Sequence, residues 1–532
     1  MSAPFTGTSH LLRLVLRRDR LRLPLWLVGL GGTIAATAAA VPPIYDSPEK
    51  VAGYASAVGA SPVSHLMSGR QAAVDTLGGI VANEISQVAQ LGICLMVLFL
   101  VIRHTRAEEE SGRAELVRST VVGRHAATLA GLLYGVVAAL LIGAITTASM
   151  LLAGLDVLGS VTYGLGLTLL GLCYAAVALV AAQLSTSARG ALGIAGAAVA
   201  VGYLVRGVGA MQDNALVWAS PFGWAQRMDA FGDEQWWPVI PLLVLSATLL
   251  GVAGWLTVHR DFAGGVLQAR AGRPRASAWL GTPFGLVVRL QRGLLIGWTI
   301  GLTALGLLYG AVIPTIPDLV ASNPDIAAVI GASPDAEQAL VDEFLRYIFL
   351  FMAVVSTGFA VSSVLRLRAE EESGRAEVVL ATRVRRSSWL GATVAFAAVG
   401  ALVVSVAMTL ALALGYALGM GEWSRIGQHV GGQLSYLPGV LMVGALAVAL
   451  TGVSPRWGGL AWAVVAFVSV QVLLGETLRL PDRLESLSPF WHLAGVPVES
   501  FEPWPALAEL AVAGVLVAVG LWGFQRRDVS AG

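Results

Sequence analysis

The sequence predicts an all-α polytopic membrane protein with twelve transmembrane helices in two parallel six-helix repeats. The chain is 56% hydrophobic and only 13% charged, with a mean hydropathy of +0.74, whereas about a quarter of the residues in a soluble domain are charged. Apolar runs of roughly 20 residues, long enough to cross ~30 Å of hydrocarbon, recur along it. In addition, the ten residues RAEEESGRAE occur twice, at 106–115 and 368–377.

Twelve apolar runs are separated by charged or Pro-rich breaks, and each is long enough for one membrane span. They fall into two sets of six on either side of an Arg-, Gly- and Pro-rich stretch without apolar periodicity. The predicted spans cover approximately residues 23–41, 87–103, 126–153, 158–183, 190–210 and 237–258, and then 293–314, 346–365, 388–418, 428–452, 457–475 and 504–524.

Arginine placement orients these spans, because short cytoplasmic loops carry an excess of positive charge. With the N-terminus inside, 26 of the 33 Arg residues fall on the cytoplasmic side. The opposite side has an acidic loop with Asp318, Asp325, Asp335, Glu337, Asp342 and Glu343. We therefore expect a multi-pass protein of the cell membrane with both termini in the cytoplasm. The outer segments 42–86 and 315–345 are too long for tight turns, and we expect ordered extracellular caps there.

The duplication extends beyond the decapeptide. LVLRRDRLRLPLW, ending at Trp26, aligns with LVVRLQRGLLIGW, ending at Trp298, at a shift of 272 residues. An even number of spans separates the copies, so both halves have the same orientation, as in parallel-repeat transporters. The predicted division is a first six-helix half at 1–262, a cytoplasmic linker at 263–283 and a second half at 284–532. Before the first span, Leu and Val alternate with Arg, which favours a helix along the inner membrane surface over a simple positive flank.

The decapeptide follows the second span of each half. Its i,i+4 pairs of Glu and Arg contribute only ~0.2 to 0.5 kcal/mol each, so local helix stability does not explain the charge density. After a Ser-Gly break, residues 113–118 and 375–379 suit a short amphipathic helix. An identical segment in both halves indicates two identical docking surfaces for two identical partners. The alternative is a solvated acidic loop.

These segments, together with the basic stretches RSTVVGR and LATRVRR that follow them, resemble the coupling-helix region of type-2 ABC exporter permeases. The fused twelve-span chain looks most like the actinobacterial permeases related to the tetronasin exporter. The resemblance implies contact with two copies of a separately encoded ATPase. The residues implied are Glu108, Glu109, Glu110, Gly112, Arg113 and Glu115, with Glu370, Glu371, Glu372, Gly374, Arg375 and Glu377. Many relatives have Gly-Thr at the Gly-Arg positions, so the role of the two Arg residues is our own inference.

The chain itself lacks the residues for ATP hydrolysis. A phosphate-binding loop needs Gly-x4-Gly-Lys-Ser/Thr, and the single lysine, Lys50, lies in DSPEKVAG. We expect a non-catalytic permease with no cofactor of its own, whose partner ATPase binds ATP and Mg²⁺. The scattered His residues predict no metal or catalytic site, and Cys94 and Cys173 are expected to be reduced packing residues. Besides the ATPase, the expected partners are the lipid bilayer and an amphipathic small molecule, with no nucleic acid.

The expected function is the ATP-driven export of amphipathic compounds such as antibiotics, ionophores or other drugs. The rival class is an ion-driven secondary transporter, which generally has ionisable residues within its spans. Only Arg206 and Glu509 are placed so here, near the outer ends, where snorkelling accounts for them. A membrane scaffold is a third class.

The resemblance further implies a substrate route between the halves, bounded by the second and fifth helices of each. Aromatic and Met side chains without charge suit a bulky apolar cargo, whereas packing or lipid contact is the alternative for each position. The candidate lining residues are Met96, Phe99, Tyr203, Phe349, Phe351, Met352 and Trp462.

Overall fold

The computed structural model divides the chain into two compact units, Met1–Gly272 and Arg273–Gly532. It describes residues 4–59, 62–70, 73–118, 121–259, 264–266, 275–315, 334–478 and 481–527. Within these ranges the regular secondary structure is entirely helical. The boundary between the units falls inside the linker predicted at 263–283.

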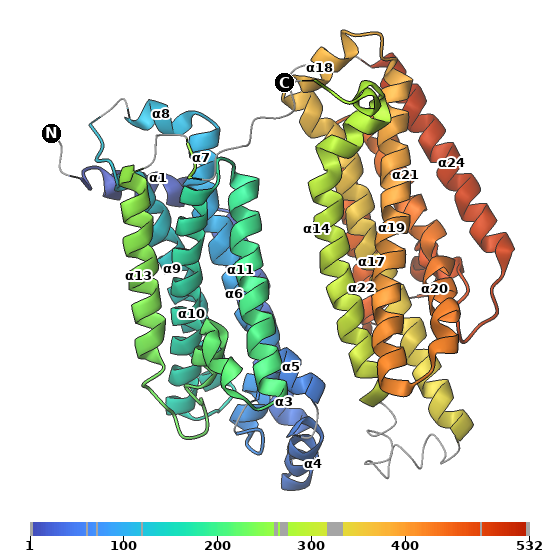
Figure 1. Ribbon diagram of the computed structural model, residues 1–532. Coiled ribbons are helices and arrows are strands. Elements are labelled where there is room, and N and C mark those ends of the chain that lie inside the picture. Colours follow the sequence, from blue (N-terminus) through green and yellow to red (C-terminus); the bar gives the residue numbers. More distant parts are fainter. Residues whose placement is uncertain are drawn as a thin grey trace. The chain divides into compact units, whose positions relative to one another are not determined.

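The first unit is a bundle of long helices, with short helices across its two ends (Figure 1). Its first span combines α2, a π-helical turn and α3 into one rod. The helices are α1 (Thr8–Arg18), α2 (Arg22–Trp26), η1 (Leu27–Gly31), α3 (Gly32–Ile44), α4 (Pro48–Gly59), α5 (Pro62–Ser68), α6 (Leu77–His104), α7 (Arg106–Glu110), α8 (Arg113–Arg118), α9 (Ala126–Leu152), α10 (Val157–Leu184), α11 (Ala188–Met211), η2 (Ala215–Ala219), α12 (Pro221–Gln226) and α13 (Val239–His259).

The second unit is also a bundle, but its fourth predicted span is divided into α20 and α21, whereas the corresponding span of the first unit, α10, is continuous. Pro438 occupies the first turn of α21, where its missing N–H is tolerated. The helices are η3 (Ala278–Gly281), α14 (Pro283–Val312), η4 (Ile313–Thr315), α17 (Pro334–Glu372), α18 (Arg375–Leu380), α19 (Arg386–Met420), η5 (Trp423–Arg425), α20 (Ile426–Ser435), α21 (Leu437–Val453), η6 (Gly458–Leu460), α22 (Ala461–Leu478), α23 (Asp482–Glu485), η7 (Pro489–His492) and α24 (Pro503–Arg526).

Eleven helical segments of the described chain are long and apolar enough to cross a membrane. They match eleven of the predicted spans, so the prediction of a polytopic membrane protein is confirmed. The run predicted at 457–475 contains the shorter apolar helix Gly458–Val472. The twelfth span and the parallel repeat therefore stay predictions.

Glycine brings several of the long helices into close contact. A Cβ at Gly306 or Gly310 of α14 would lie 2.1 or 2.2 Å from a carbonyl oxygen of α19. A Cβ at Gly452 of α21 would lie 2.2 Å from the carbonyl oxygen of Gly520 in α24. Such separations are too short for any larger residue. Because lipid tails are as apolar as the side chains, close packing between small residues drives helix association in a membrane.

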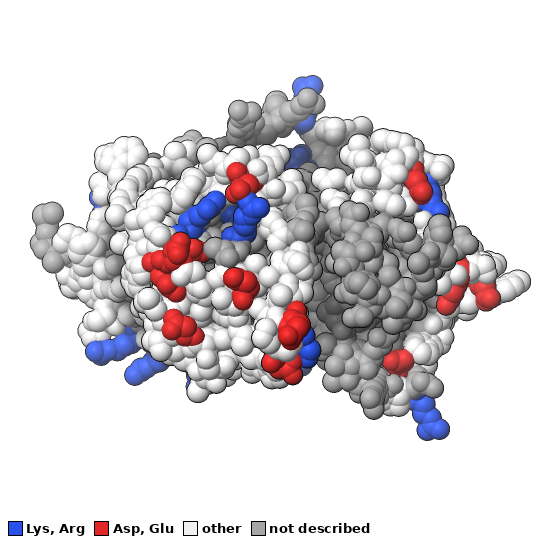
Figure 2. Space-filling model, turned by 90° about the horizontal axis from the view of Figure 1, so that it is seen from below, with Lys and Arg blue, Asp and Glu red and all other residues white. Residues whose placement is uncertain are grey.

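The end of the first unit that lies away from α1, α7 and α8 has ordered helices between the first two spans (Figure 1). Helix α4 contacts α6 there, since the Tyr54 hydroxyl donates to Glu84 at 2.5 Å and accepts from the Asn83 amide at 2.7 Å. Figure 2 shows the face at this end, with Asp and Glu side chains among a few Lys and Arg side chains. The predicted cap at 42–86 is thus mostly helical in its described parts, with turns at 45–47 and 73–76, whereas most of the cap at 315–345 lies outside the described residues.

Candidate functional site

Both copies of the decapeptide contain the same backbone break. Gly112 and Gly374 have φ angles of 73° and 71°, in the left-handed region that side-chain-bearing residues rarely adopt. A Cβ at either position would meet nothing within 4 Å, so the backbone conformation, and not a lack of space, requires glycine. The predicted Ser-Gly break is confirmed, and so are the short helices after it, α8 and α18. Each lies across one end of its unit (Figure 1).

In the first unit, Arg106 fixes the decapeptide to neighbouring segments. Its guanidinium is buried and donates to the Glu109 carboxylate at 2.7 Å. It also donates to the carbonyl oxygen of Thr186 at 2.7 Å and to that of Gly264 at 2.9 Å. Thr186 lies just before α11, so this cation joins the end of the second span to the start of the fifth.

Glu110 strengthens the same connection. Its carboxylate accepts a 2.8 Å hydrogen bond from the backbone N–H of Ala188, the first residue of α11. Negative charge at a helix N-terminus is stabilised by the unpaired N–H groups and the helix dipole, by about 0.3 to 1 kcal/mol at an exposed site. A displacement of this part of the decapeptide would therefore act directly on α11.

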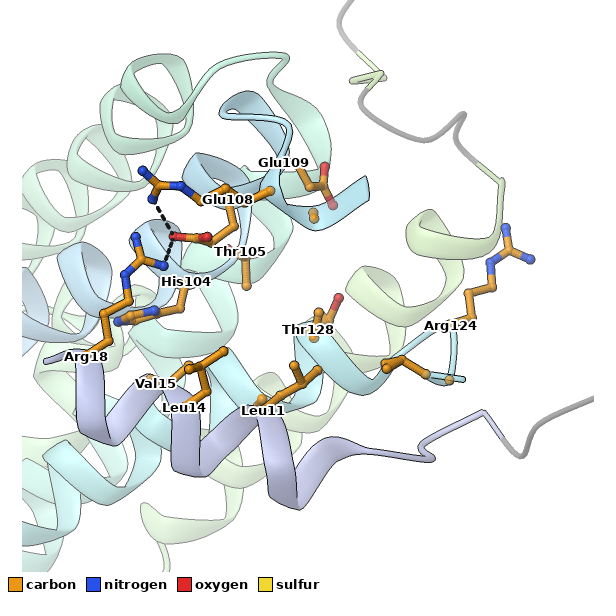
Figure 3. Close-up of a pocket in the computed structure, with 16 residues that line it drawn as sticks. Leu11, Leu14, Val15, Arg18, His104, Thr105, Glu108, Glu109, Arg124 and Thr128 are labelled. Carbon is orange, nitrogen blue, oxygen red and sulfur yellow. Dashed lines mark hydrogen bonds and ion pairs between the residues drawn. The ribbon is translucent and has the colours of Figure 1, made fainter. Parts of the chain in front are cut away.

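Helix α1 packs against α9 and lies beside the decapeptide of the first unit. The Glu108 carboxylate lies 2.6 Å from the Arg18 guanidinium and 3.7 Å from that of Arg113 (Figure 3). These residues border a cavity of about 90 Å³, which Leu11 and Leu14 of α1 also line. The predicted helix before the first span is thus present as α1, and an ion pair links it to the acidic cluster.

Asp19, which ends α1, forms a second connection to the end of α6. Its buried carboxylate lies 2.7 Å from Nε2 of His104 and 3.4 Å from Nε of Arg103. Burial alone would raise the pKa of Asp19, but the hydrogen bond with His104 and the nearby positive charges together hold this pKa below its usual range. The carboxylate therefore stays ionised and holds α1 against the start of the decapeptide segment.

In the second unit the same ten residues make different contacts. Here α17 continues through Glu372, while α6 of the first unit ends at His104 before the separate helix α7. The Glu371 carboxylate lies 2.6 and 2.9 Å from the Arg527 guanidinium, which also donates to the carbonyl oxygen of Gly452 at 3.1 Å. The second decapeptide is thus bound to the end of α24 and to α21.

The neighbouring glutamates of this copy pair locally. Glu370 is buried and accepts hydrogen bonds of 2.6 and 3.1 Å from Arg375, and this pairing raises the pKa of the arginine. Glu372 is exposed and lies 2.7 Å from Nε of Arg368. Arg368 corresponds in sequence to Arg106, yet Arg368 is half-exposed and Arg106 is buried.

These differences correct one expectation from the sequence. The acidic clusters were expected to be partly exposed, but Glu370 and Glu371 are each only 4% exposed. Identical sequences differ here because the segments that surround them have diverged. The charged residues that remain exposed lie at corresponding positions of the two copies: Glu110, Arg113 and Glu115, and Glu372, Arg375 and Glu377.

The candidate route residues fall into two groups. Met96, Phe349 and Met352 are fully buried and belong to the hydrophobic cores of their own units, which fits the packing alternative. Phe99 and Trp462 are more than 40% exposed on their units. The remaining candidates, Tyr203 and Phe351, are half-buried.

The two ionisable residues assigned to snorkelling are in fact buried. Arg206 of α11 is fully buried, donates to the carbonyl oxygen of Met67 at 2.9 Å and lies 4.2 Å above the Tyr203 ring. Glu509 of α24 is 6% exposed, and neither carboxylate oxygen has a hydrogen-bond partner among the described residues. Snorkelling is therefore the wrong interpretation, because both side chains face neighbouring helices.

The architecture defines a multi-pass helical membrane protein with a charged, helix-flanked segment at one end of each unit. Within the described residues no group of His, Cys, Asp or Glu side chains is arranged to hold a metal ion. Residues 280–525 match the family model described as the C-terminal domain of the multidrug efflux system permease Rv1217c.

The full chain is similar to a protein of Mycobacterium tuberculosis (strain ATCC 25618 / H37Rv), the multidrug efflux system permease protein Rv1217c. The two are 38% identical over 530 residues, which cover 99% of this chain and 96% of the relative. The chain therefore belongs to this family of multidrug efflux permeases. Membership fits the predicted resemblance to ABC-type permeases.

Proposed function

We propose that this permease is the membrane subunit of an ATP-driven ABC exporter, and that its two decapeptides dock a separately encoded, homodimeric ATPase. The observation that carries the proposal is the repeated local geometry: a left-handed glycine, then a short helix with exposed charges, at one end of each unit. A homodimeric motor would present the same contact twice. ATP and Mg²⁺ would then be bound by the partner, and the cargo would be an amphipathic compound such as an antibiotic or ionophore.

In this proposal the exposed and the buried residues of the decapeptides have different roles. Glu110, Glu115, Glu372 and Glu377 are exposed and so accessible to the partner, even though Glu110 also contacts α11 and Glu372 also pairs with Arg368. Glu109 and Glu371 hold the segment onto its own unit. Movement of the first segment would act on α11 through Arg106 and Glu110, and movement of the second would act on α24 and α21. Phe99 and Trp462, exposed on their units, are the best-placed candidates for the cargo route. The likeness to tetronasin exporters remains a prediction about cargo.

Charge reversal tests the docking role. One variant combines Glu110→Lys with Glu115→Lys, a second combines Glu372→Lys with Glu377→Lys, and a third has all four changes. Like charges across an interface cost several kcal/mol, so each pair should reduce ATPase co-purification and substrate-stimulated hydrolysis, and all four should abolish both. Glu502→Lys, at an exposed site before α24, is the matched control and should behave as wild type. Wild-type transport by the fourfold variant at normal expression would show that the segments are solvated loops.

Buried ionisable residues keep the ion-driven alternative open to test. Arg206 and Glu509 lie within spans, where charged side chains are costly and often mark relays. The purified permease, reconstituted alone in liposomes, should show no drug movement when a proton or sodium gradient is imposed. Gradient-driven drug movement without ATP would establish the secondary transporter and overturn the proposal.

A further inference from the structure

The second unit contains an apolar cavity between α17, α19, α21 and α24. Its volume is about 170 Å³. For comparison, an apolar protein cavity of about 150 Å³ is large enough to bind benzene. The lining includes Ala360 and Val364 of α17, Leu441 and Gly444 of α21, and Ala513 and Gly514 of α24. A cavity of this size and composition accepts one aromatic ring and offers no group that would bind its polar substituents.

Small side chains on adjacent helices create this cavity. A Cβ at Gly444 would lie 3.2 Å from that of Ala360, so α17 and α21 are in contact at one edge. A Cβ at Gly514 would meet nothing within 4 Å, so α24 leaves space on its side. Leu510 and Gly514, which also line the cavity, are exposed, so the cavity opens to the surface of the unit beside α24. An apolar ligand can therefore enter it from that side.

Glu509 lies one helical turn from this cavity on α24. It precedes Ala513 by four residues, and side chains at this spacing are neighbours about 5 to 6 Å apart. Both are buried, at 6% and 7% exposure, and so they share the face of α24 that packs into the unit. Among the described residues neither oxygen of Glu509 accepts a hydrogen bond, and no cationic side chain forms an ion pair with it.

An unpaired carboxylate in this position is costly. Burial of an isolated charge is strongly unfavourable unless a partner of opposite charge is present. Ionisable residues inside a membrane are accordingly rare, and they commonly mark a functional site. The chain supplies an apolar receptor for a ring, and one turn away it supplies a buried carboxyl group without a partner, which a bound cation would stabilise in its ionised form.

We propose that this cavity and Glu509 together bind a hydrophobic organic cation, with an aromatic ring in the cavity and the positive centre at the carboxylate. The size of the cavity selects an aryl group, and the carboxylate selects positive charge over negative. This inference names a class of cargo for the proposed exporter. Only the statement that the bound cation is cargo rests on the proposed function. Binding itself requires no ATPase.

The test uses the purified full chain in lipid nanodiscs, without any ATPase. Radiolabelled tetraphenylphosphonium is the probe, because it combines phenyl rings with a permanent positive charge. Tetraphenylborate, which has the same shape and a negative charge, is the matched ligand control. We expect saturable binding of the cation and no competition by the anion. Glu509→Gln keeps the shape of the side chain and should raise the Kd about tenfold or more, since the Coulomb attraction between the carboxylate and the phosphonium is lost.

Two further variants separate the roles of charge and cavity. Gly514→Leu adds volume beside the cavity where the backbone has free space, and it should also raise the Kd. Glu502→Gln removes an exposed carboxylate next to the same helix and should leave the Kd unchanged. Size-exclusion profiles and melting temperatures equal to those of the wild type exclude misfolding.

Some outcomes would overturn the inference. Wild-type affinity in Glu509→Gln would exclude the carboxylate, and equal affinity for tetraphenylborate would exclude charge selection. An unchanged Kd in Gly514→Leu would exclude the cavity. Because this measurement contains no ATPase and the charge-reversal test changes no residue of this site, either proposal can fail without the other.

Discussion

Identical residues should have unequal energetic coupling in the two decapeptides. Arg106 and Glu109 in the first copy correspond to Arg368 and Glu371 in the second. In the first copy these two side chains form an ion pair at 2.7 Å. In the second copy Glu371 pairs with Arg527 instead, and Arg368 pairs with Glu372. The perturbation is a double-mutant cycle with Gln substitutions at both positions of each copy.

The expected coupling energy of each pair follows from how far its two side chains are buried. The Arg106 side chain is 1% exposed and that of Glu109 is 13% exposed, so water screens their interaction little. A hydrogen bond between charged groups in such a setting contributes about 1.5 to 3 kcal/mol. The Arg368 and Glu372 side chains are 39% and 57% exposed, and an i,i+4 pair of this kind contributes only about 0.3 to 0.5 kcal/mol. For Arg368 with Glu371 we expect coupling near zero.

The assay is thermal unfolding of the purified chain in nanodiscs. About 1 kcal/mol corresponds to roughly 2 to 4 °C in domains of 150 to 250 residues. The cycle at Arg106 and Glu109 should therefore depart from additivity by about 3 °C or more, and the cycle at Arg368 and Glu371 by less than about 1 °C. A third cycle, at Glu371 and Arg527, should resemble the first. Equal coupling in the first two cycles would refute the reasoning, because it would mean that the decapeptide alone sets its contacts.

Three other predictions concern the backbone, the pH response and the topology. Gly112→Ala and Gly374→Ala should each destabilise the protein by about 1 kcal/mol, because alanine is strained at these φ angles; a melting temperature unchanged or raised in both would contradict this. Asp19→Asn should remove a part of the stability that depends on acid. Because the pKa of Asp19 is lowered in the folded protein, this part is complete above the ordinary pKa of about 3.9 and is lost as the pH falls through the folded pKa. Between pH 6 and 3 the melting temperature of the variant should therefore fall less steeply than that of the wild type. A cysteine in place of Glu499 should react with an impermeant thiol reagent from outside sealed cells, and a cysteine in place of Ser111 should not. Both native cysteines are buried and give a low background. External labelling at position 111 would show that the predicted orientation is wrong.

Much of the architecture follows from composition and local backbone chemistry, without knowledge of any tertiary contact. Eleven predicted spans coincide with long apolar helices, because a chain in hydrocarbon must satisfy its backbone hydrogen bonds within each segment. The break at Gly112 and Gly374 was equally local, since a glycine in the left-handed region needs no distant partner. These features depend on residues close in sequence, and the sequence therefore predicts them.

Only the tertiary structure decided which face of each helix is buried. In a membrane the lipid-facing and core-facing side chains are both apolar, so the pattern that separates them in a soluble helix is weak. The burial of Glu509 and Arg206 was missed for this reason. Likewise, Glu109 and Glu371 have identical sequence neighbours but different partners, Arg106 and Arg527. Arg527 lies 156 residues from Glu371, and the packing of both α17 and α24 against α21 brings the two charges together.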